Sequence, residues 1–168
     1  VAAVNAGVPI SAPAMNVNRL CGSGLQAIVS AAQGIALGEY DVSIGAGAES
    51  MSNAPHMTSA GRNGVKMGNL VFEDAMLGAL HDPFEGFHMG ITAENVAQRC
   101  SISREEQDAL AVQSQQRAAA AIANGYFKDQ IVPVEIKTRK GTVVFDTDEH
   151  VRGDTTAEGL AGLKPVFK

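Results

Sequence analysis

The hydrophobic pattern of the chain is clearest over residues 20–38, which carry no charged side chain. Apolar residues recur there at the spacing of a helix, namely Leu25, Ile28, Val29, Ala32, Ile35 and Ala36. Because Ala27 and Ala31 make the opposite side apolar too, the pattern predicts a helix that is buried nearly all round. Gly38 is expected to end this helix, since glycine adopts the left-handed conformation without a steric penalty.

A second, shorter apolar run covers residues 41–47 and contains Val42 and Ile44. Its glycines, Gly45 and Gly47, are typical of a strand that another backbone approaches closely. The run therefore predicts a buried strand. A helix followed by such a strand predicts a layered α/β fold.

The remaining pattern is more polar. Residues 50–87 are rich in Gly, Met and Asn and show weak periodicity, which predicts a long irregular segment. Such a segment inside a compact protein usually has a function or contacts another subunit. A short helix is expected over residues 92–100. A second helix should begin at Ser103, where Ser103 and Glu106 form a capping box, and end at Gly125. Residues 132–137 and 142–146 flank a turn and predict a β-hairpin.

Composition narrows the classes of protein. A chain of 168 residues with 45% hydrophobic and 18% charged residues is globular in type. The net charge of −5 argues against nucleic acid as a partner, because no basic excess is present to bind phosphates. No apolar run is long enough to cross a bilayer. The two distant cysteines form no disulfide framework, so we expect a reducing, cytoplasmic location.

Cys21 is the candidate nucleophile, because it directly precedes the apolar helix. The N-terminus of a helix presents unpaired N–H groups and a partial positive charge that favours anions, and the thiolate is the nucleophilic form of cysteine. Gly22 and Gly24 leave room for a substrate, and the N–H groups of this turn could hold a developing oxyanion. An ordinary core cysteine explains the spacing equally well.

Three blocks of the sequence resemble the thiolases, and the likeness is strongest to bacterial acetyl-CoA acetyltransferases and β-ketothiolases. The blocks are residues 18–25, around Cys21, residues 47–52, and residues 88–96, which begin at His88. They occur in the family's order and at its spacing, and the similarity continues to Lys168. The resemblance implies an interior segment of a thiolase, because the family's second catalytic half, with its histidine and second cysteine, has no counterpart here.

The resemblance also assigns roles to single residues. It implies that Cys21 carries the acyl group. His88 and Met89 match residues that line the tunnel for the pantetheine arm, Leu80 matches an apolar position that covers the cofactor, and Arg152 matches an arginine beside the adenine of coenzyme A. Gly159 departs from the serine that the family often has there, which leaves the contacts on the adenosine side open.

The resulting prediction is an α/β protein in which residues 1–50 are part of the layered N-terminal domain. Residues 51–168 are expected to form an α+β loop domain that covers coenzyme A and makes oligomer contacts, with residues 62–68 matching the loop used in tetramers. Acyl-CoA is the expected substrate, and no permanently bound cofactor is expected. The parent protein is expected to be a homotetramer that acts in fatty acid metabolism. We expect carbon–carbon bond formation or cleavage in 3-ketoacyl-CoA, through an acyl-enzyme.

Two other functions are compatible with parts of this sequence. A decarboxylating condensing enzyme of the ketosynthase type shares the nucleophile on a helix, and a non-catalytic binding fragment derived from a thiolase stays open for the chain alone. We expect the chain by itself to be inactive. His56, His81 and Asp82 match no zinc spacing, so no metal site is expected, and residues 81–83 are expected to form a turn.

Overall fold

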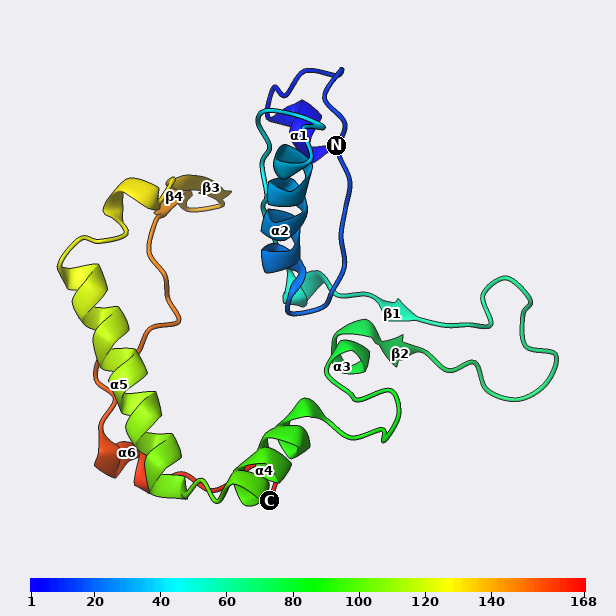
Figure 1. Cartoon of the computed structure of the whole chain (residues 1–168). Helices are drawn as coiled ribbons and strands as arrows, with labels where there is room; N and C mark the ends of the chain where they lie inside the picture. The colour runs from blue at the N-terminus through cyan, green and yellow to red at the C-terminus, as the bar shows by residue number, and fades with distance from the viewer. The chain divides into compact units, whose positions relative to one another are not determined.

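A computed structural model describes residues 1–168, and the chain divides into two compact units, residues 1–86 and 87–168. The first unit contains α1 (Ala2–Asn5), α2 (Ser23–Ala36), the 3₁₀ turn η1 (Met51–Asn53), β1 (His56–Met57), β2 (Glu73–Asp74) and α3 (Ala75–Ala79) (Figure 1). The second unit contains α4 (Met89–Cys100), α5 (Arg104–Ala123), η2 (Lys128–Gln130), β3 (Val134–Thr138), β4 (Gly141–Phe145) and α6 (Ala157–Ala161). The two units reflect which residues lie close together in this chain. They do not test the domain boundary predicted at residue 50, which stays a prediction.

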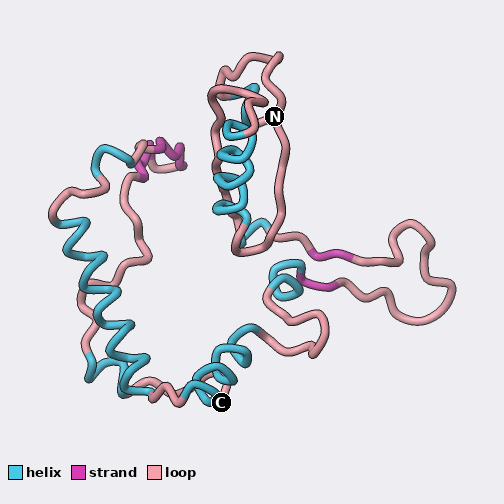
Figure 2. The backbone as a smooth tube through the Cα atoms, in the orientation of Figure 1, coloured by secondary structure: helices cyan, strands magenta, loops and turns pink.

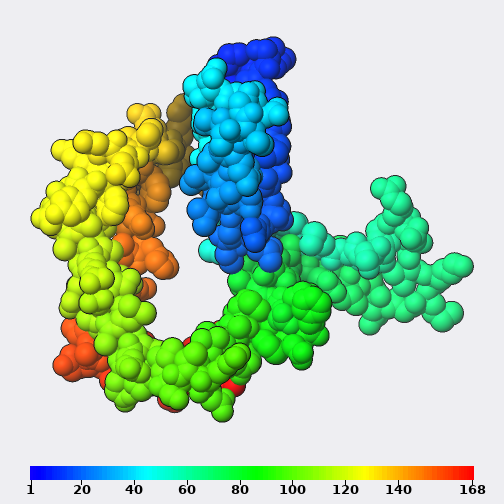
Figure 3. Space-filling model, viewed as in Figure 1, coloured from blue at the N-terminus to red at the C-terminus, as the bar shows by residue number.

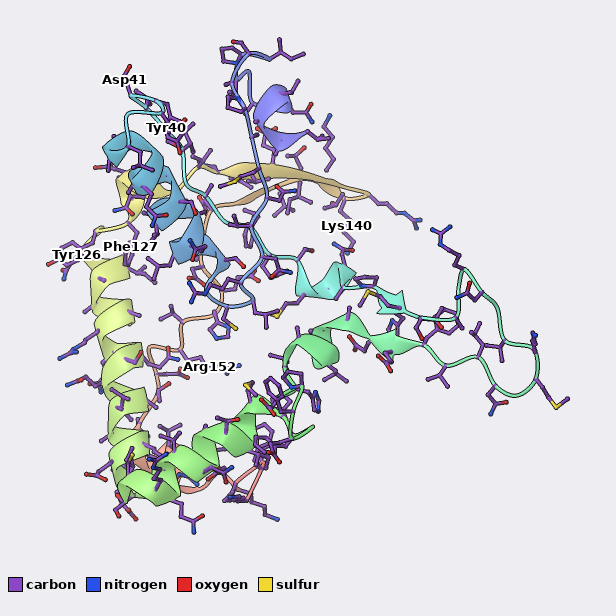
Figure 4. The ribbon with its side chains drawn as sticks, turned by 45° about the vertical axis from the view of Figure 1, so that its right-hand side comes forward. Tyr40, Asp41, Tyr126, Phe127, Lys140 and Arg152 are labelled. Carbon is purple, nitrogen blue, oxygen red and sulfur yellow. The ribbon has the colours of Figure 1, made fainter.

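The predicted helix after Cys21 is confirmed as α2. Gly38 ends it with φ +75°, in the left-handed region that glycine occupies without strain. The ring of Tyr40 then folds back over the helix, and a Cβ at Gly34 would overlap that ring. Tyr40 lies just beyond the end of α2 in Figure 4.

The strand predicted for residues 41–47 is wrong for this chain. Residues 41–49 are extended but make no backbone–backbone hydrogen bond, so no ladder forms (Figure 2). The segment instead runs antiparallel along α2. A Cβ at Gly47 would lie 3.4 Å from the Cα of Gly24, and one at Gly45 would lie 2.9 Å from the Cα of Ile28. The glycines allow close backbone approach as predicted, but the approach is to a helix, because no neighbouring strand is present.

The prediction that α2 is buried is also wrong within this chain. Leu25 is 69% exposed and Ile28 is 56% exposed, and no residue of the chain is buried. The exposed area is 14733 Å² for 17.4 kDa, whereas a folded monomer of this mass exposes about 7,900 Å². The elements of residues 1–168 therefore do not supply their own hydrophobic core.

Residues 50–87 are less irregular than predicted. β1 and β2 pair antiparallel, with His56 opposite Asp74, and the Asp74 side chain then accepts hydrogen bonds from the N–H groups of Met76 and Leu77. Asp74 thus joins the strand pair to α3 as its N-cap. The loop between the strands, residues 58–72, stands clear of the rest of its unit (Figure 3).

Both helices predicted for the second unit form. The first, α4, begins at Met89, three residues earlier than residue 92, because His88 caps it. The capping box at the start of α5 is confirmed: the Ser103 hydroxyl accepts from the N–H of Glu106 at 3.1 Å, and the Glu106 carboxylate accepts from the N–H of Ser103 at 2.8 Å. Gly125, with φ +72°, follows the end of α5.

The predicted hairpin forms as β3 and β4. Val134 faces Phe145 and Ile136 faces Val143, so these four side chains share one apolar face of the ribbon. All four are exposed, which leaves this face uncovered within the second unit. Lys140 lies at the turn, at the far end of the hairpin (Figure 4).

Arg104, the first residue of α5, joins α5 to α6. Its Nε donates to both carboxylate oxygens of Asp108, at 2.8 and 2.9 Å. Its Nη2 donates to the carbonyl oxygens of Leu160 at 2.7 Å and Leu163 at 3.2 Å. Leu160 lies in the last turn of α6 and Leu163 lies just beyond its end. The N–H of Leu163 also donates to the Leu160 carbonyl, at 2.9 Å, so Arg104 adds a second donor to that carbonyl.

Replacing Arg104 by Met should therefore lower the free energy of unfolding of the whole protein by about 1–3 kcal/mol, since two charge-assisted bonds to carbonyls are lost. The measurement is the urea midpoint of purified variants. Arg117→Met on the same helix is the matched control, because the Arg117 side chain makes no hydrogen bond or ion pair. Equal midpoints for the two variants would contradict the role of Arg104.

No helix of the chain is both long enough and apolar enough to span a membrane.

Candidate functional site

The backbone around Cys21 forms a tight, strained turn. Leu20 has φ +47°, a value that a branched side chain rarely adopts. The N–H of Gly22 donates to the Arg19 carbonyl at 3.0 Å, and that of Ser23 donates to the Leu20 carbonyl at 3.1 Å. The Ser23 hydroxyl spans the turn, since it accepts from the N–H of Arg19 at 2.9 Å and donates to the Leu20 carbonyl at 2.7 Å. Strain held in this way is typical of functional sites.

This turn leaves Cys21 exposed, directly before the first turn of α2. The N–H groups of Gly24 and Leu25 have no hydrogen-bond acceptor within the chain, because the first helical bond of α2 runs from Gln26 to Gly22. A Cβ at Gly24 would meet nothing within 4 Å, so space is open beside these donors. The turn therefore presents a thiol, free N–H groups and space for a substrate together.

Cys100 has the opposite setting. It is also exposed, but it is the last residue of α4, where the helix dipole is negative and disfavours an anion. Ser101, with φ +54°, ends the helix directly after it. Exposure therefore does not distinguish the two thiols, whereas their positions on the helices do.

His88 lies at the N-terminus of α4, as its cap. Its Nδ1 accepts a hydrogen bond from the N–H of Gly90 at 2.9 Å. Its ring stacks on the ring of Phe167, with centroids 4.9 Å apart and planes 20° apart. A Cβ at Gly90 would overlap the Phe167 ring, so only glycine fits there.

Met89 follows His88 and lines an open groove of about 400 Å³ on the second unit. The other lining residues come from α4, from the turn after it and from the start of α5, and are Thr92, Ala93, Val96, Ala97, Ile102 and Gln107. The groove is mainly apolar, as a site for an aliphatic group should be.

Leu80 lies in the first unit as the C-cap of α3 and is half-buried. The turn predicted at residues 81–83 forms slightly later, over residues 82–86. The Asp82 carboxylate accepts from the N–H groups of Phe84 at 3.1 Å and Glu85 at 2.5 Å, and the Asp82 carbonyl accepts from the N–H of Gly86 at 2.9 Å. Nδ1 of His81 lies 2.6 Å from the Leu77 carbonyl oxygen. No cluster of three His, Cys, Asp or Glu residues that could hold a metal occurs in the chain.

Arg152 lies on the segment that runs back along α5 (Figure 4). Its N–H donates to Oε1 of Gln115 at 2.8 Å, and its carbonyl accepts from the hydroxyl of Thr155 at 2.7 Å. A Cβ at Gly153 would lie 3.0 Å from the Cβ of Ala119, so the backbone packs closely on the helix. The Arg152 guanidinium makes no ion pair and is exposed, so it is accessible to an anionic ligand.

The five candidates fall into two sets. Cys21 and Leu80 belong to the first unit, and His88, Met89 and Arg152 belong to the second. Sequence reasoning missed Phe167 beside His88 and Ser23 beside Cys21. Ser23 had a local signal, since a hydroxyl two residues after the cysteine can cap the turn. Phe167 had no such local signal, because it lies 79 positions after His88 in the sequence.

The comparisons with known proteins agree along the whole chain. The family model for the N-terminal domain of thiolase matches residues 1–168. Beta-ketothiolase BktB of Cupriavidus necator is 65% identical over 167 residues, which are 99% of this chain and 42% of that protein. The acetyl-CoA acetyltransferase of Chromobacterium violaceum is 50% identical over 169 residues, 99% of this chain and 43% of that protein. The chain therefore spans about two fifths of the length of these relatives.

Solved structures give the same result. The acetyl-CoA acetyltransferase of Bacillus anthracis superposes with a TM-score of 0.91 at 46% identity, over 99% of this chain and 42% of that one. A human mitochondrial 3-ketoacyl-CoA thiolase in complex with CoA superposes with a TM-score of 0.87 at 44% identity, over 98% of this chain and 41% of that one. Identity at this level makes the likeness one of family as well as of fold.

Proposed function

The chain belongs to the thiolase family, through the family's N-terminal domain, and on this premise we propose that the whole protein is an acetyl-CoA C-acyltransferase that forms its acyl-enzyme on Cys21. The observation that carries the proposal is the turn that presents the Cys21 thiol beside the unpaired N–H groups of Gly24 and Leu25. Sequence similarity to the family also supports the proposal, since a β-ketothiolase is 65% identical to this chain over 167 residues.

The first half of the proposed reaction uses this turn. The Cys21 thiolate attacks the carbonyl carbon of an acyl-CoA thioester, a C–S bond forms, and the carbonyl electrons move to the oxygen. The free N–H groups of α2 donate to this oxyanion. When the oxyanion collapses, the C–S bond to coenzyme A breaks, and coenzyme A leaves as its thiolate.

The second half joins two acyl groups. An acetyl-CoA loses an α-proton, and its carbanion attacks the acyl carbon held on Cys21. The new C–C bond forms as the Cys21 thiolate leaves, which gives a 3-ketoacyl-CoA. No residue of this chain is assigned as the base for the α-proton, and the chain spans only 42% of the β-ketothiolase, so the chain alone is proposed to be inactive.

Coenzyme A and its thioesters are the proposed ligands, bound as substrates and not as a permanent cofactor. His88 and Met89 are proposed to contact the pantetheine arm and Arg152 the adenine end. Leu80 is proposed as a further apolar contact of coenzyme A. The apolar groove beside Met89 and the unpaired guanidinium of Arg152 support these roles, since one suits an aliphatic chain and the other an anion.

The parent protein is further proposed to be a cytoplasmic homotetramer in fatty acid metabolism. The loop of residues 58–72 supports the assembly, because it carries exposed Met67, Val71 and Phe72 on a segment that stands clear of its unit. Exposed apolar groups on such a loop are suited to contact another protomer.

Acetyl transfer to Cys21 tests the proposed function directly. The full-length protein is incubated with acetyl-CoA, quenched in acid and mapped by peptide mass spectrometry. We expect one acetyl group on the peptide that contains Cys21 and none on the peptide that contains Cys100. Acetylation of both cysteines at equal rates, or of neither, would contradict the proposed role.

A further inference from the structure

The last residues of the chain form a strap across the second unit. Before the strap, Nη2 of Arg104 donates to the carbonyl of Leu163 at 3.2 Å. At its other end, Nζ of Lys168 donates to Oδ1 of Asn95 on α4 at 2.6 Å. In Figure 1 the C-terminal end of the chain lies beside α4. Residues 164–168 are thus held at both ends and pass over the start of α4.

Phe167 is the residue of the strap that meets the candidate site. Its ring stacks on His88 and also covers the backbone at Gly90, where no side chain would fit. Offset-stacked aromatic rings with centroids at this distance attract each other beyond the effect of area alone. At 42% exposure Phe167 remains open on its other side, as a residue beside a ligand would be.

Among the contacts of His88, the Gly90 bond and the Phe167 ring act together on the imidazole. The Gly90 N–H bond holds Nδ1 as an acceptor, and a neutral imidazole with Nδ1 as acceptor carries its proton on Nε2. A tilt of the ring would lengthen this bond. The Phe167 ring opposes such a tilt, because a tilt would also break the stacked arrangement.

We propose that Phe167 is a positioning residue for His88, holding the imidazole in the plane and tautomer in which it meets the acyl-CoA ligand. The proposal rests on the proposed function for its ligand, and on the ring geometry for its mechanism. Phe167 acts through His88, so its removal should have no effect on catalysis where His88 is already absent.

A double-mutant cycle in the full-length protein tests this dependence. Phe167→Leu should lower kcat/KM for acetoacetyl-CoA cleavage by about three- to tenfold, mainly through KM, since a stacked pair contributes that much binding. In the His88→Ala background the same change should have no further effect. Phe167→Tyr keeps a ring on the imidazole and should restore most of the activity. Phe127→Leu is the matched control, because Phe127 is 44% exposed and stacks on no ring.

A second readout does not depend on activity. In protein labelled with ¹⁵N-histidine, the His88 ring should show the Nε2–H tautomer in the unmodified protein and in Phe167→Tyr, and a mixture of tautomers in Phe167→Leu. Gly90→Ala, which displaces the Phe167 ring, should give the same mixture without altering Phe167. An unchanged tautomer in these variants, or an equal loss of kcat/KM with and without His88, would overturn the proposal. If the unmodified protein shows the tautomer but cleaves no acetoacetyl-CoA, the proposed function fails while the positioning stands.

Discussion

Replacing Cys21 by alanine should reduce the cleavage of acetoacetyl-CoA by the full-length protein by about a thousandfold or more. The thiolate is the only group proposed to bond to the substrate, and removal of a nucleophile disables the groups that act with it. The measurement is the loss of acetoacetyl-CoA absorbance in the presence of coenzyme A. Binding of the substrate should persist, because the proposed contacts to coenzyme A come from His88, Met89 and Arg152.

Cys100→Ala is the matched control for this experiment. Cys100 is also exposed but lies at the C-terminus of α4, outside every proposed contact. Its replacement should leave the rate within a factor of about two. Residual activity of Cys21→Ala near that of the unmodified protein would show that the acyl group is carried elsewhere.

Gly45→Ala should destabilise the full-length protein by about 2–3 kcal/mol. The added Cβ would lie 2.9 Å from the Cα and N of Ile28 and 3.1 Å from the carbonyl carbon of Ala27. These are main-chain atoms of a helix, which cannot rotate aside as a side chain can. The helix and the segment of residues 41–49 must therefore move apart, and the turn that carries Cys21 would move with α2. The urea midpoint and the rate of Cys21 acetylation should both fall.

The same substitution at another glycine provides the control. Gly78 lies inside α3, has no positive φ, and its Cβ would meet nothing within 4 Å. Gly78→Ala should be neutral or slightly stabilising, because alanine loses less conformational entropy in a helix. If Gly45→Ala is tolerated as well as Gly78→Ala, the close packing of residues 41–49 on α2 does not hold in the whole protein.

The resemblance of three short blocks identified the family from sequence, and the comparisons confirmed it. The same reasoning could not describe the environment of each block. α2 was expected to be buried because it is apolar on all sides, yet burial depends on what covers a helix and not on the helix itself. Leu25 and Ile28 remain exposed, since no element of residues 1–168 covers them. The strand predicted at residues 41–47 does not form for a similar reason. A strand needs a neighbouring strand for its backbone hydrogen bonds, and none lies beside this segment.

Features that depend on a few neighbouring residues were determined by the sequence alone. The Ser103–Glu106 capping box, the end of α2 at Gly38 and the hairpin of β3 and β4 all form as predicted. Each results from hydrogen bonds or backbone preferences between residues at most a few positions apart, or from a tight turn, so local composition contains the necessary information.

Only the tertiary structure brought distant residues together. Phe167 on His88, Arg104 on the carbonyls of α6 and the Gln115 side chain on the backbone of Arg152 each join positions at least 37 residues apart. No periodicity or spacing encodes such pairs, because the loop that separates them can take many paths at similar entropic cost. The partner of each residue is chosen by how the helices and the strap pack, which is why the ring that holds His88 became visible only in three dimensions.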